Sequence, residues 1–504
     1  MTQFTTIPCG GRVQRGDIPH LPFDIFRTQA LDIVKNGGKV VHFFAYEDQG
    51  TMKFMAVLRT DRLLAAGCDA PETYASLTKR CEQFHLFERE MAEQFGIRPE
   101  GHPWLKMVRY HKNSRSKPDV FNNDYTEDIP GNYDYYQVKG DEIHEVAVGP
   151  VHAGVIEPGH FRFNCIGERV LHLEIQLGYQ HRGVETLLLT AKPKQLPILA
   201  ENIAGDTTIG HGLCMAQAVE ALASVQVDAG AKIIRTIALE LERLANHIGD
   251  LGALCMDVAF LAPANYFGRI RGDFLNLSLL LCGNRFGKGL VRPGGVRFSL
   301  DDEIRKTLDE RLKELKPQVE HVLELIFSAS TVRARFEGCG SVRAEDADHL
   351  GLVGPAGRAS GLAYDARRCF PTEHYPHLLI PENAKPTGDV YARARVRYDE
   401  VKQSIDIIQF LIGKSIDTQP VEGGMAALQA LAPSSFAVTL NEGWRGEVSH
   451  AVLTDEAGNI LRYKVKDPSF HNWNGLAMAL RDTGISDFPL NNKSFNLSYC
   501  GFDL

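Results

Sequence analysis

The stretch "DAGAKIIRTIALELERLANHIGDLGALC", residues 228–255, decides the fold class of the larger part of this chain. Its apolar side chains recur three and four positions apart, the spacing that places them on one face of a helix: Ile237, Leu241, Leu244, Ile248, Leu251 and Cys255. The sequence therefore predicts a long helix with one buried face inside a helical core.

A second stripe on the same helix carries Glu240, Arg243, His247 and Asp250, again three and four positions apart. This stripe fits a proton relay or a row of ion pairs facing another subunit. It fits equally an ordinary charged face, either solvated or paired within the chain. The sequence leaves both alternatives open.

Around this helix the patterns predict further helices and small sheets. A second long helix is expected from about Val390 to Ile412, followed by three strands at 435–440, 447–454 and 459–465. Earlier, "ERVLHLEIQLGY" (168–179) alternates as a half-buried strand with Leu171, Leu173, Ile175 and Leu177 on the inner face.

The N-terminal part predicts a compact unit of both strands and helices. Residues 40–46 and 52–59 form an expected hairpin, and the apolar spacing after Pro71 predicts a helix that ends at Gly96. Residues 112–140 are polar and rich in turn residues. We therefore predict an α+β fold: a small α+β domain (1–111), a linker (112–145), and a mainly helical domain with small flanking sheets (146–504).

Composition narrows the classes of function. The 504 residues are 44% hydrophobic, which suffices for more than one domain, and the net charge of -8 provides no overall basic field for nucleic acid. The opening residues lack a signal-peptide pattern, and no apolar run approaches the ~18 residues that cross a bilayer. We expect contact with a membrane only through partners.

Ten cysteines are scattered along the chain, and no two stand at Cys-x-x-Cys spacing. We expect reduced, buried cysteines, with no structural zinc or iron-sulfur cluster held by this chain.

Long motifs identify a family. "HLFEREMAEQFGIRPEGHP" (85–103) resembles the signature of the small hydrophilic subunit of respiratory complex I. "LGYQHRGVETLL" (177–188), "LELERLANHIGDLGAL" (239–254) and "VRPGG" (291–295) resemble its larger catalytic partner, which is homologous to the large subunit of energy-converting [NiFe]-hydrogenases. The fusion of both modules, and "EPGHFRF" (157–163), look most like hydrogenase-side proteins of the formate hydrogenlyase type.

The resemblance implies two Cys-x-x-Cys pairs that hold nickel and iron, and this chain has neither. Ala204 and Thr207 stand at the first pair, and Ser469 and Asn472 stand at the second, after Asp467-Pro468. Alanine has no donor atom, and neutral oxygens are poor substitutes for soft, anionic sulfur. We expect no NiFe centre and no hydrogenase activity. The tail "NLSYCGFDL" (496–504) is what we expect where no nickel-dependent processing occurs.

Protonatable residues remain in the motifs around this emptied site: Glu157, His160, Asp206, His211, Asp467 and His471. We expect them to accept or relay protons, or to bind an acceptor other than H2, in a cavity between the 201–222 helix start and a loop at 467–476. The last four also suit a harder metal ion, but we favour a buried hydrogen-bonded seam without metal.

A quinone site is less well matched. His152 occupies the first position of the family's H-P-x-x-H-G loop, but the rest of that loop differs. Met215 stands where the family has its quinone-binding tyrosine. Both hydrogen bonds to a quinone head group are therefore in doubt.

The resemblance implies a peripheral-arm subunit on the cytoplasmic side of a membrane-bound, complex I-like assembly that couples electron transfer to proton or sodium translocation. Implied partners are a small subunit carrying an iron-sulfur cluster, membrane subunits resembling ion antiporters, and a ferredoxin-like or dehydrogenase module. This chain would hold no cofactor itself. The alternatives are a structural coupling scaffold, expected if Phe470 and Trp473 fill the cavity, and a quinone-reducing subunit.

Overall fold

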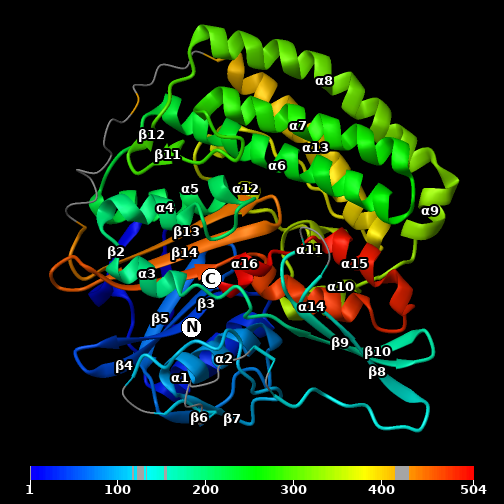
Figure 1. Ribbon diagram of the computed structural model, residues 1–504. Helices are drawn as coiled ribbons and strands as arrows, with labels where there is room; N and C mark the ends of the chain where they lie inside the picture. Colours follow the sequence, from blue (N-terminus) through cyan, green and yellow to red (C-terminus); the bar gives the residue numbers. More distant parts are fainter. Residues whose placement is uncertain are drawn as a thin grey trace.

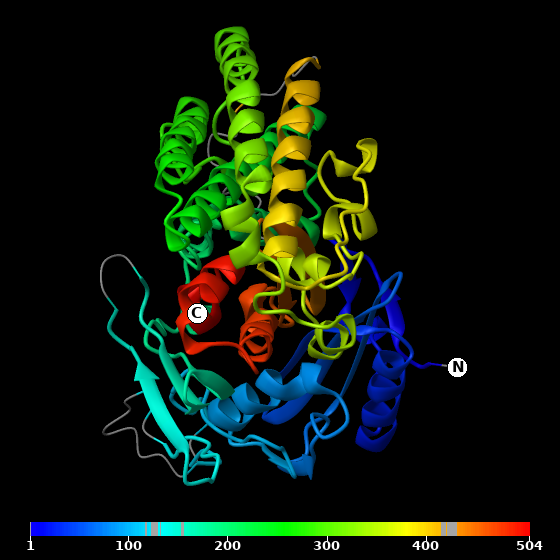
Figure 2. The same cartoon turned by 90° about the vertical axis from the view of Figure 1, so that its right-hand side faces the viewer.

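The computed structural model describes residues 2–115, 118–121, 130–131, 133–152, 156–414, 420 and 431–504. A bundle of long helices lies at one end of the molecule and the larger sheets lie toward the other, as Figures 1 and 2 show from two sides. The predicted α+β class is confirmed. None of the helices in these ranges is both long and apolar enough to cross a bilayer.

The N-terminal part forms a four-stranded antiparallel sheet of order β1-β5-β4-β3, on which α1 and α2 pack. The predicted hairpin is confirmed. The bounds are β1 (Thr5–Ile7), α1 (Phe23–Lys35), β3 (Lys39–Asp48), β4 (Thr51–Arg59), β5 (Leu63–Asp69), β6 (Thr73–Ala75), α2 (His85–Phe95) and β7 (Arg98–Glu100).

The helix predicted from Pro71 is wrong over its first half, since α2 begins only at His85. Strand β6 precedes it and pairs in parallel with β7. The Glu88 carboxylate accepts hydrogen bonds from the backbone N–H groups of Leu77 (2.7 Å) and Thr78 (3.2 Å). This tertiary contact satisfies donors that a helix would otherwise use, so the apolar spacing here reflects burial alone.

A second four-stranded sheet joins the two ends of the chain. Its order is β15-β14-β13-β2, with β2 (Arg12–Gln14), β13 (Ser435–Gly443), β14 (Gly446–Thr454) and β15 (Ile460–Lys466). The three C-terminal strands confirm the prediction, whereas β2 beside β13 was not foreseen. The domain boundaries at 111 and 145 stay a prediction.

The third sheet has the order β10-β9-β8: β8 (Ile143–Val148), β9 (His160–Ile166) and β10 (Arg169–Gln176). The predicted strand is confirmed, but the prediction of which residues form its inner face is partly wrong. A bulge between Val170 and His172 shifts the alternation, so that Val170 and Glu174 are buried while Leu171 is only half-buried.

The helical layer contains α6 and α13, both confirmed. Asp228 caps α6 by accepting a hydrogen bond from the Ala231 N–H at 2.7 Å. The bounds are α3 (Val184–Thr190), α4 (Leu196–Ala200), α5 (Thr208–Ala223), α6 (Ala229–Asp257), α7 (Leu261–Cys282), β11 (Val291–Arg292), β12 (Gly295–Val296), α8 (Asp302–Ser328), α9 (Ser330–Phe336), α10 (Ala344–Leu350), α11 (Gly354–Ala359), α12 (Ala366–Cys369), α13 (Val390–Ile412), α14 (Ser469–Ala479), α15 (Phe488–Phe495) and α16 (Tyr499–Asp503).

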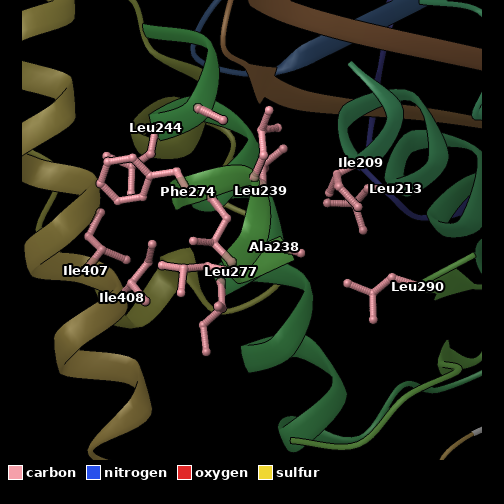
Figure 3. Close-up of a cluster of buried hydrophobic side chains, with 14 of the residues drawn as sticks. Ile209, Leu213, Ala238, Leu239, Leu244, Phe274, Leu277, Leu290, Ile407 and Ile408 are labelled. Atoms are coloured by element: carbon pink, nitrogen blue, oxygen red, sulfur yellow. The ribbon is translucent and has the colours of Figure 1, made fainter. Parts of the chain in front are cut away.

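Apolar side chains hold the long helices together. Figure 3 shows Leu244 of α6 and Phe274 of α7 beside Ile407 and Ile408 of α13. All four are buried or nearly so. Burying side chains of this size stabilises the bundle by about 1.5–3 kcal/mol each.

The charged stripe of α6 is paired within the chain. Glu240, Arg243 and His247 are 0% exposed, which excludes a solvated face. His247 contacts the Glu400 carboxylate of α13 at 2.8 Å, and Asp250 pairs with Arg397 at 2.7 Å. The stripe therefore faces α13 and its neighbours, and no part of it faces outward to another subunit.

Replacing Glu400 tests this network, because its carboxylate also accepts from Arg358 of α11 at 2.7 Å. Removing one member of a buried ion pair leaves an uncompensated charge, so Glu400→Gln should lower the free energy of unfolding by about 3–5 kcal/mol. Denaturant unfolding followed by circular dichroism measures this. The control Glu310→Gln removes an exposed carboxylate on α8 and should change the stability by less than about 0.5 kcal/mol; equal effects would contradict the network's importance.

Candidate functional site

Asp467 fixes the start of α14. Its Oδ1 accepts a hydrogen bond from the Ser469 N–H at 2.8 Å, and Pro468 occupies the position before the first helical residue. The segment 467–476, expected to be a loop, is therefore helical from Ser469 onward. Position 468, directly before the helix, has a proline and not the usual Ser, Thr, Asp or Asn. The capping side chain is that of Asp467, one residue earlier.

Glu242 of α6 fixes the start of α5. Its carboxylate accepts hydrogen bonds from the N–H groups of Ile209 (2.7 Å) and Gly210 (3.2 Å), which lie in the first turn. Burial, and then the neighbouring Asp206 carboxylate, outweigh the two hydrogen bonds and raise the pKa of Glu242 to about 8. Glu242 is thus a buried carboxyl group that is mostly protonated near neutral pH.

Asp206, one residue ahead of α5's cap, is held by the turn between β13 and β14. Arg445 donates to both of its carboxylate oxygens, at 2.6 and 2.7 Å. Burial alone would lower the pKa of Arg445, but the Asp206 carboxylate outweighs it and holds that pKa above its ordinary value. This bidentate pair ties the start of α5 to the second sheet.

A chain of hydrogen bonds connects α5, the second sheet and the start of α14. His211 Nε2 lies 3.1 Å from Asp467 Oδ2, and His211 Nδ1 lies 3.1 Å from His450 Nε2. His450 Nδ1 lies 2.8 Å from the Tyr463 hydroxyl. His211, His450 and Tyr463 are 0% exposed and Asp467 is 1% exposed, so the chain is closed to solvent.

The charge of Asp467 sets the direction of these bonds. Burial would raise the pKa of Asp467, but the hydrogen bond from His211 and the nearby Arg445 guanidinium lower it below its usual value. Burial, and then the neighbouring His211, holds the pKa of His450 well below its ordinary value, so this ring is neutral. Tyr463 then donates to His450, His450 to His211, and His211 to the ionised carboxylate of Asp467.

A proton that enters at the Tyr463 end can reverse every bond in this chain: Tyr463 passes its proton to His450, His450 passes one to His211, and His211 passes one to Asp467. Protonated Asp467 would donate to His211, His211 to His450, and His450 to the Tyr463 oxygen. Because each imidazole has one nitrogen toward each neighbour, the rings need not move. The arrangement is chemically suited to transfer protons over the length of the chain.

The four positions at which the family resemblance implies cysteines do not have the side chains that a nickel-iron centre needs. Ala204 offers no donor, and the Thr207 hydroxyl lies 3.3 Å from both Arg445 and Asp206. Ser469 Oγ accepts from the Ser498 N–H at 2.9 Å, and the Asn472 amide bonds both backbone groups of Val353 at 3.0 and 3.1 Å. These side chains are used to join protein segments. Among the described residues, no three His, Cys, Asp or Glu side chains are placed to hold a metal ion.

Glu157 lies at the edge of this site. Its Oε2 lies 3.4 Å from the Tyr499 N–H at the start of α16. The next residue, Cys500, has its pKa raised to about 12 by burial and by the Glu157 carboxylate, so its thiol stays protonated. The segment 498–501 lies between Glu157 and the emptied site. Tyr499 contacts Glu157, and Gly501 lies so close to Asp467 that an added Cβ would be 2.7 Å from Asp467 Oδ2.

His160 and His471 lie elsewhere. His160 contacts the Gly149 carbonyl (3.1 Å) and Arg162 (3.3 Å) on the third sheet. His471 packs edge-on against Phe87 of α2, its Nε2 has no partner among the described residues, and burial lowers its pKa to about 3. Of the six predicted site residues, the structure brings Asp206, His211 and Asp467 together, places Glu157 beside them, and separates these two histidines from them.

Phe470 and Trp473 fill space beside the site. Phe470 packs against Phe87 with ring centroids 4.8 Å apart, and Trp473 packs against Tyr499 at 4.8 Å. Both side chains are almost completely buried. The emptied site is therefore polar, as expected of a site with protonatable groups, but it is also closed, as expected if Phe470 and Trp473 fill the cavity.

Sequence reasoning did not select Glu242, Arg445, His450 or Tyr463. Arg445 lies between the predicted strands at 435–440 and 447–454, in a turn that offered a signal for it. His450 and Tyr463 lie in predicted strands, where an inward polar residue cannot be told from an outward one before the sheet's neighbours are known.

Comparisons with known proteins agree with this architecture. Residues 32–119 match the family described as "Respiratory-chain NADH dehydrogenase, 30 Kd subunit", and residues 257–430 match "Respiratory-chain NADH dehydrogenase, 49 Kd subunit". Formate hydrogenlyase subunit 5 of Escherichia coli (strain K12) is 28% identical over 475 residues, which cover 90% of this chain and 80% of that protein. Membrane-bound hydrogenase subunit alpha of Pyrococcus furiosus is 30% identical over 358 residues, 68% of this chain and 83% of that protein.

A solved structure shares the fold. A chain of the membrane-bound sulfane sulfur reductase, an archaeal respiratory membrane complex, superposes with a TM-score of 0.68 at 24% identity. The match covers 73% of this chain and all of that one.

The raised pKa of Glu242 makes stability depend on pH. The folded chain holds a proton on Glu242 up to about pH 8, whereas the unfolded chain releases it near pH 4.5. The stabilisation of the folded state by this proton is therefore complete below pH 4.5 and is lost as the pH rises toward 8. Glu242→Gln should remove up to about 1.4 kcal/mol per pH unit of this dependence, measured by urea unfolding at several pH values. Glu303→Gln, at an exposed carboxylate of α8, should leave the dependence as it is; a parallel shift for both variants would contradict the assignment.

Proposed function

This chain belongs to the family in which a domain like the complex I 30-kDa subunit is fused to a hydrogenase-related domain like the 49-kDa subunit, and on that premise we propose a function in ion-translocating electron transfer. The chain would be a peripheral-arm subunit of a membrane-bound, complex I-like assembly that couples electron transfer to proton or sodium translocation. It would work without a NiFe centre.

The observation that carries this proposal is the buried chain Tyr463–His450–His211–Asp467, which adjoins position 207 through the His211 N–H and position 469 through Asp467. Its four groups are protonatable, and each contacts the next. In the proposed role, these residues take up or deliver protons when a neighbouring cluster changes its charge. Positioned groups of this kind typically accelerate proton transfer by about 10²–10⁴-fold.

The burial of these groups favours proton transfer over binding of an acceptor. With His211, His450 and Asp467 at most 1% exposed, a proton can enter along hydrogen bonds, whereas a substrate would require the site to open. A quinone head is supported less, because His152 contacts the Gly159 carbonyl of its own loop at 2.9 Å and Met215 is fully buried in the core.

Exposed apolar side chains near the site support docking of a small subunit that carries an iron-sulfur cluster. Val151 and Ile156, which precede Glu157, are 88% and 50% exposed, and Leu187 of α3 and Ile198 of α4 are similarly open. Exposed apolar side chains of this size are available for contacts with another subunit. The cluster would belong to that partner, while antiporter-like membrane subunits and a ferredoxin-like or dehydrogenase module would complete the assembly on the cytoplasmic side.

A structural role is the second candidate, and the closed site favours it. Ser469, Asn472 and Thr207 all join protein segments, as expected of residues kept for the fold. In that case the chain would connect redox and membrane modules without moving protons itself.

Two substitutions separate these candidates. His211→Phe breaks the middle of the chain, and Asp467→Asn removes its proton acceptor while keeping an oxygen for the Ser469 N–H. In the purified complex reconstituted in vesicles, both should lower electron-transfer-driven ion uptake at least about tenfold. His160→Phe, a histidine outside the chain, is the matched control and should retain uptake. If all three variants assemble and pump at the parental rate, the relay is wrong and the scaffold is supported.

Metal content gives an independent test. Since the donor atoms at positions 204, 207, 469 and 472 do not suit nickel, the purified complex should contain iron from its partner's cluster but less than about one-tenth nickel per chain. Plasma mass spectrometry measures both. Stoichiometric nickel would overturn the proposal that this subunit works without a NiFe centre, whatever the uptake assays show.

A further inference from the structure

A large cavity lies away from the emptied metal site, at the junction of α2, the segment 103–108, β10 and α14. Its volume is about 460 Å³. Cavities of roughly 300–1,000 Å³ are the size that encloses a small-molecule ligand. None of the groups in the proton-transfer chain lines it, so its occupant is a separate question from the proposed function.

Arg89 places a buried positive charge on the wall of this cavity. Its side chain is only 8% exposed, and its hydrogen bonds go to neutral acceptors: the Lys106 and Met107 carbonyls (2.7 and 2.8 Å) and His85 Nε2 (3.3 Å). Among the described residues no carboxylate lies within ion-pair distance of it. Within the described ranges, two of the five guanidinium N–H groups have no acceptor, and a buried cation without an ion-pair partner is unfavourable unless an anion reaches it.

The nearby acids are already engaged. Glu174, which also lines the cavity, pairs with Lys106 at 2.8 Å and accepts from the Tyr136 N–H at 2.7 Å. Glu93, one helical turn after Arg89, accepts from the N–H groups of Val108 and Arg109. Both acids attract Arg89 through space, but the burial of its guanidinium outweighs them and lowers the pKa of Arg89, and neither acid forms an ion pair with it.

Flat rings form part of the cavity wall. Trp104 lies with its ring centroid 5.7 Å from that of His172, and His172 Nε2 is buried without a partner among the described residues. Trp473 lines the wall from α14. Aromatic and imidazole faces favour stacking with another flat ring, and the free Nε2 offers it one hydrogen bond.

The mouth carries more positive than negative charge. Lys79 and Arg481 line it, both are exposed, and neither forms an ion pair within the described part of the chain. Glu82 is the one exposed acid among the described residues that line it. A net positive rim draws anions toward the opening.

We propose that this cavity binds a planar aromatic anion of mononucleotide size. The ring lies against Trp104 and His172, the anionic group reaches Arg89, and Lys79 and Arg481 hold the outer part of the ligand. Two sources share this chemistry, a flavin mononucleotide and an adenine nucleotide, and the experiment separates them.

Calorimetric titration of the full-length chain, together with the subunits that copurify with it, tests the proposal. The probes are FMN, ADP and, as a ring-free comparison, sodium phosphate. We expect saturable binding of FMN or ADP and at least about tenfold weaker binding of phosphate, because stacking on an aromatic side chain contributes about 1–3 kcal/mol. FMN binding should also quench tryptophan emission, since two of the three tryptophans line the cavity.

Substitutions locate the site. Arg89→Gln should weaken binding at least tenfold, and Trp104→Leu should bring the nucleotide affinity close to that of phosphate. The double variant of the exposed cations, Lys79→Gln with Arg481→Gln, should weaken binding severalfold without affecting folding, so it keeps the test valid if Arg89→Gln does not fold. Arg62→Gln with Lys306→Gln, two exposed cations elsewhere, is the matched control and should bind normally. Absence of saturable nucleotide binding, equal affinity for phosphate, or parental affinity in every folded cavity variant would each overturn the proposal.

Discussion

Buried ion pairs occupy the place where α6 meets α11, α12, α13 and β13. Arg243 lies 3.3 Å from Glu240 and 3.6 Å from Glu400, while Arg358 contacts Glu400 and Glu442 at 2.7 Å each. Charges removed from water must be paired with good geometry, because each unpaired ion would cost several kcal/mol. This requirement fixes how the helices can approach the second sheet, since any other packing would leave charges without partners.

The same network positions the candidate site. Arg243 donates to the carbonyls of Glu442 and Gly443 at 2.6 and 3.1 Å, which holds the turn between β13 and β14. That turn presents Arg445 to Asp206, and β14 presents His450 to His211. The ion pairs of α6 thus determine where the second sheet lies, and the sheet determines where the hydrogen-bonded chain runs.

The side chains at positions 207, 469 and 472 are used for contacts within the chain. Asn472 bonds the backbone of Val353, the residue before α11, and Ser469 bonds the backbone of Ser498. Thr207 lies beside the Asp206–Arg445 pair. Buried polar groups need partners, and here the partners come from within the chain. The starts of α5 and α14 are therefore stabilised by hydrogen bonds between segments of this chain, beside a row of protonatable groups.

Much of this protein follows from local sequence patterns. The period of apolar residues determined α6 and α13, the strand alternation determined β13 to β15, and the long motifs determined the family and the absence of thiolates at 204, 207, 469 and 472. These features depend on residues close together in the chain, where spacing and side-chain chemistry are sufficient.

Tertiary structure alone decided which groups meet. β2 joins β13 across more than 400 residues, and Glu88 prevents the helix expected after Pro71. His450 and Tyr463 complete the chain from Asp467, while His160 and His471 lie apart from it. Each outcome depends on a hydrogen bond or packing contact outside the element itself, and the periodicity of a single segment contains no information about its partner.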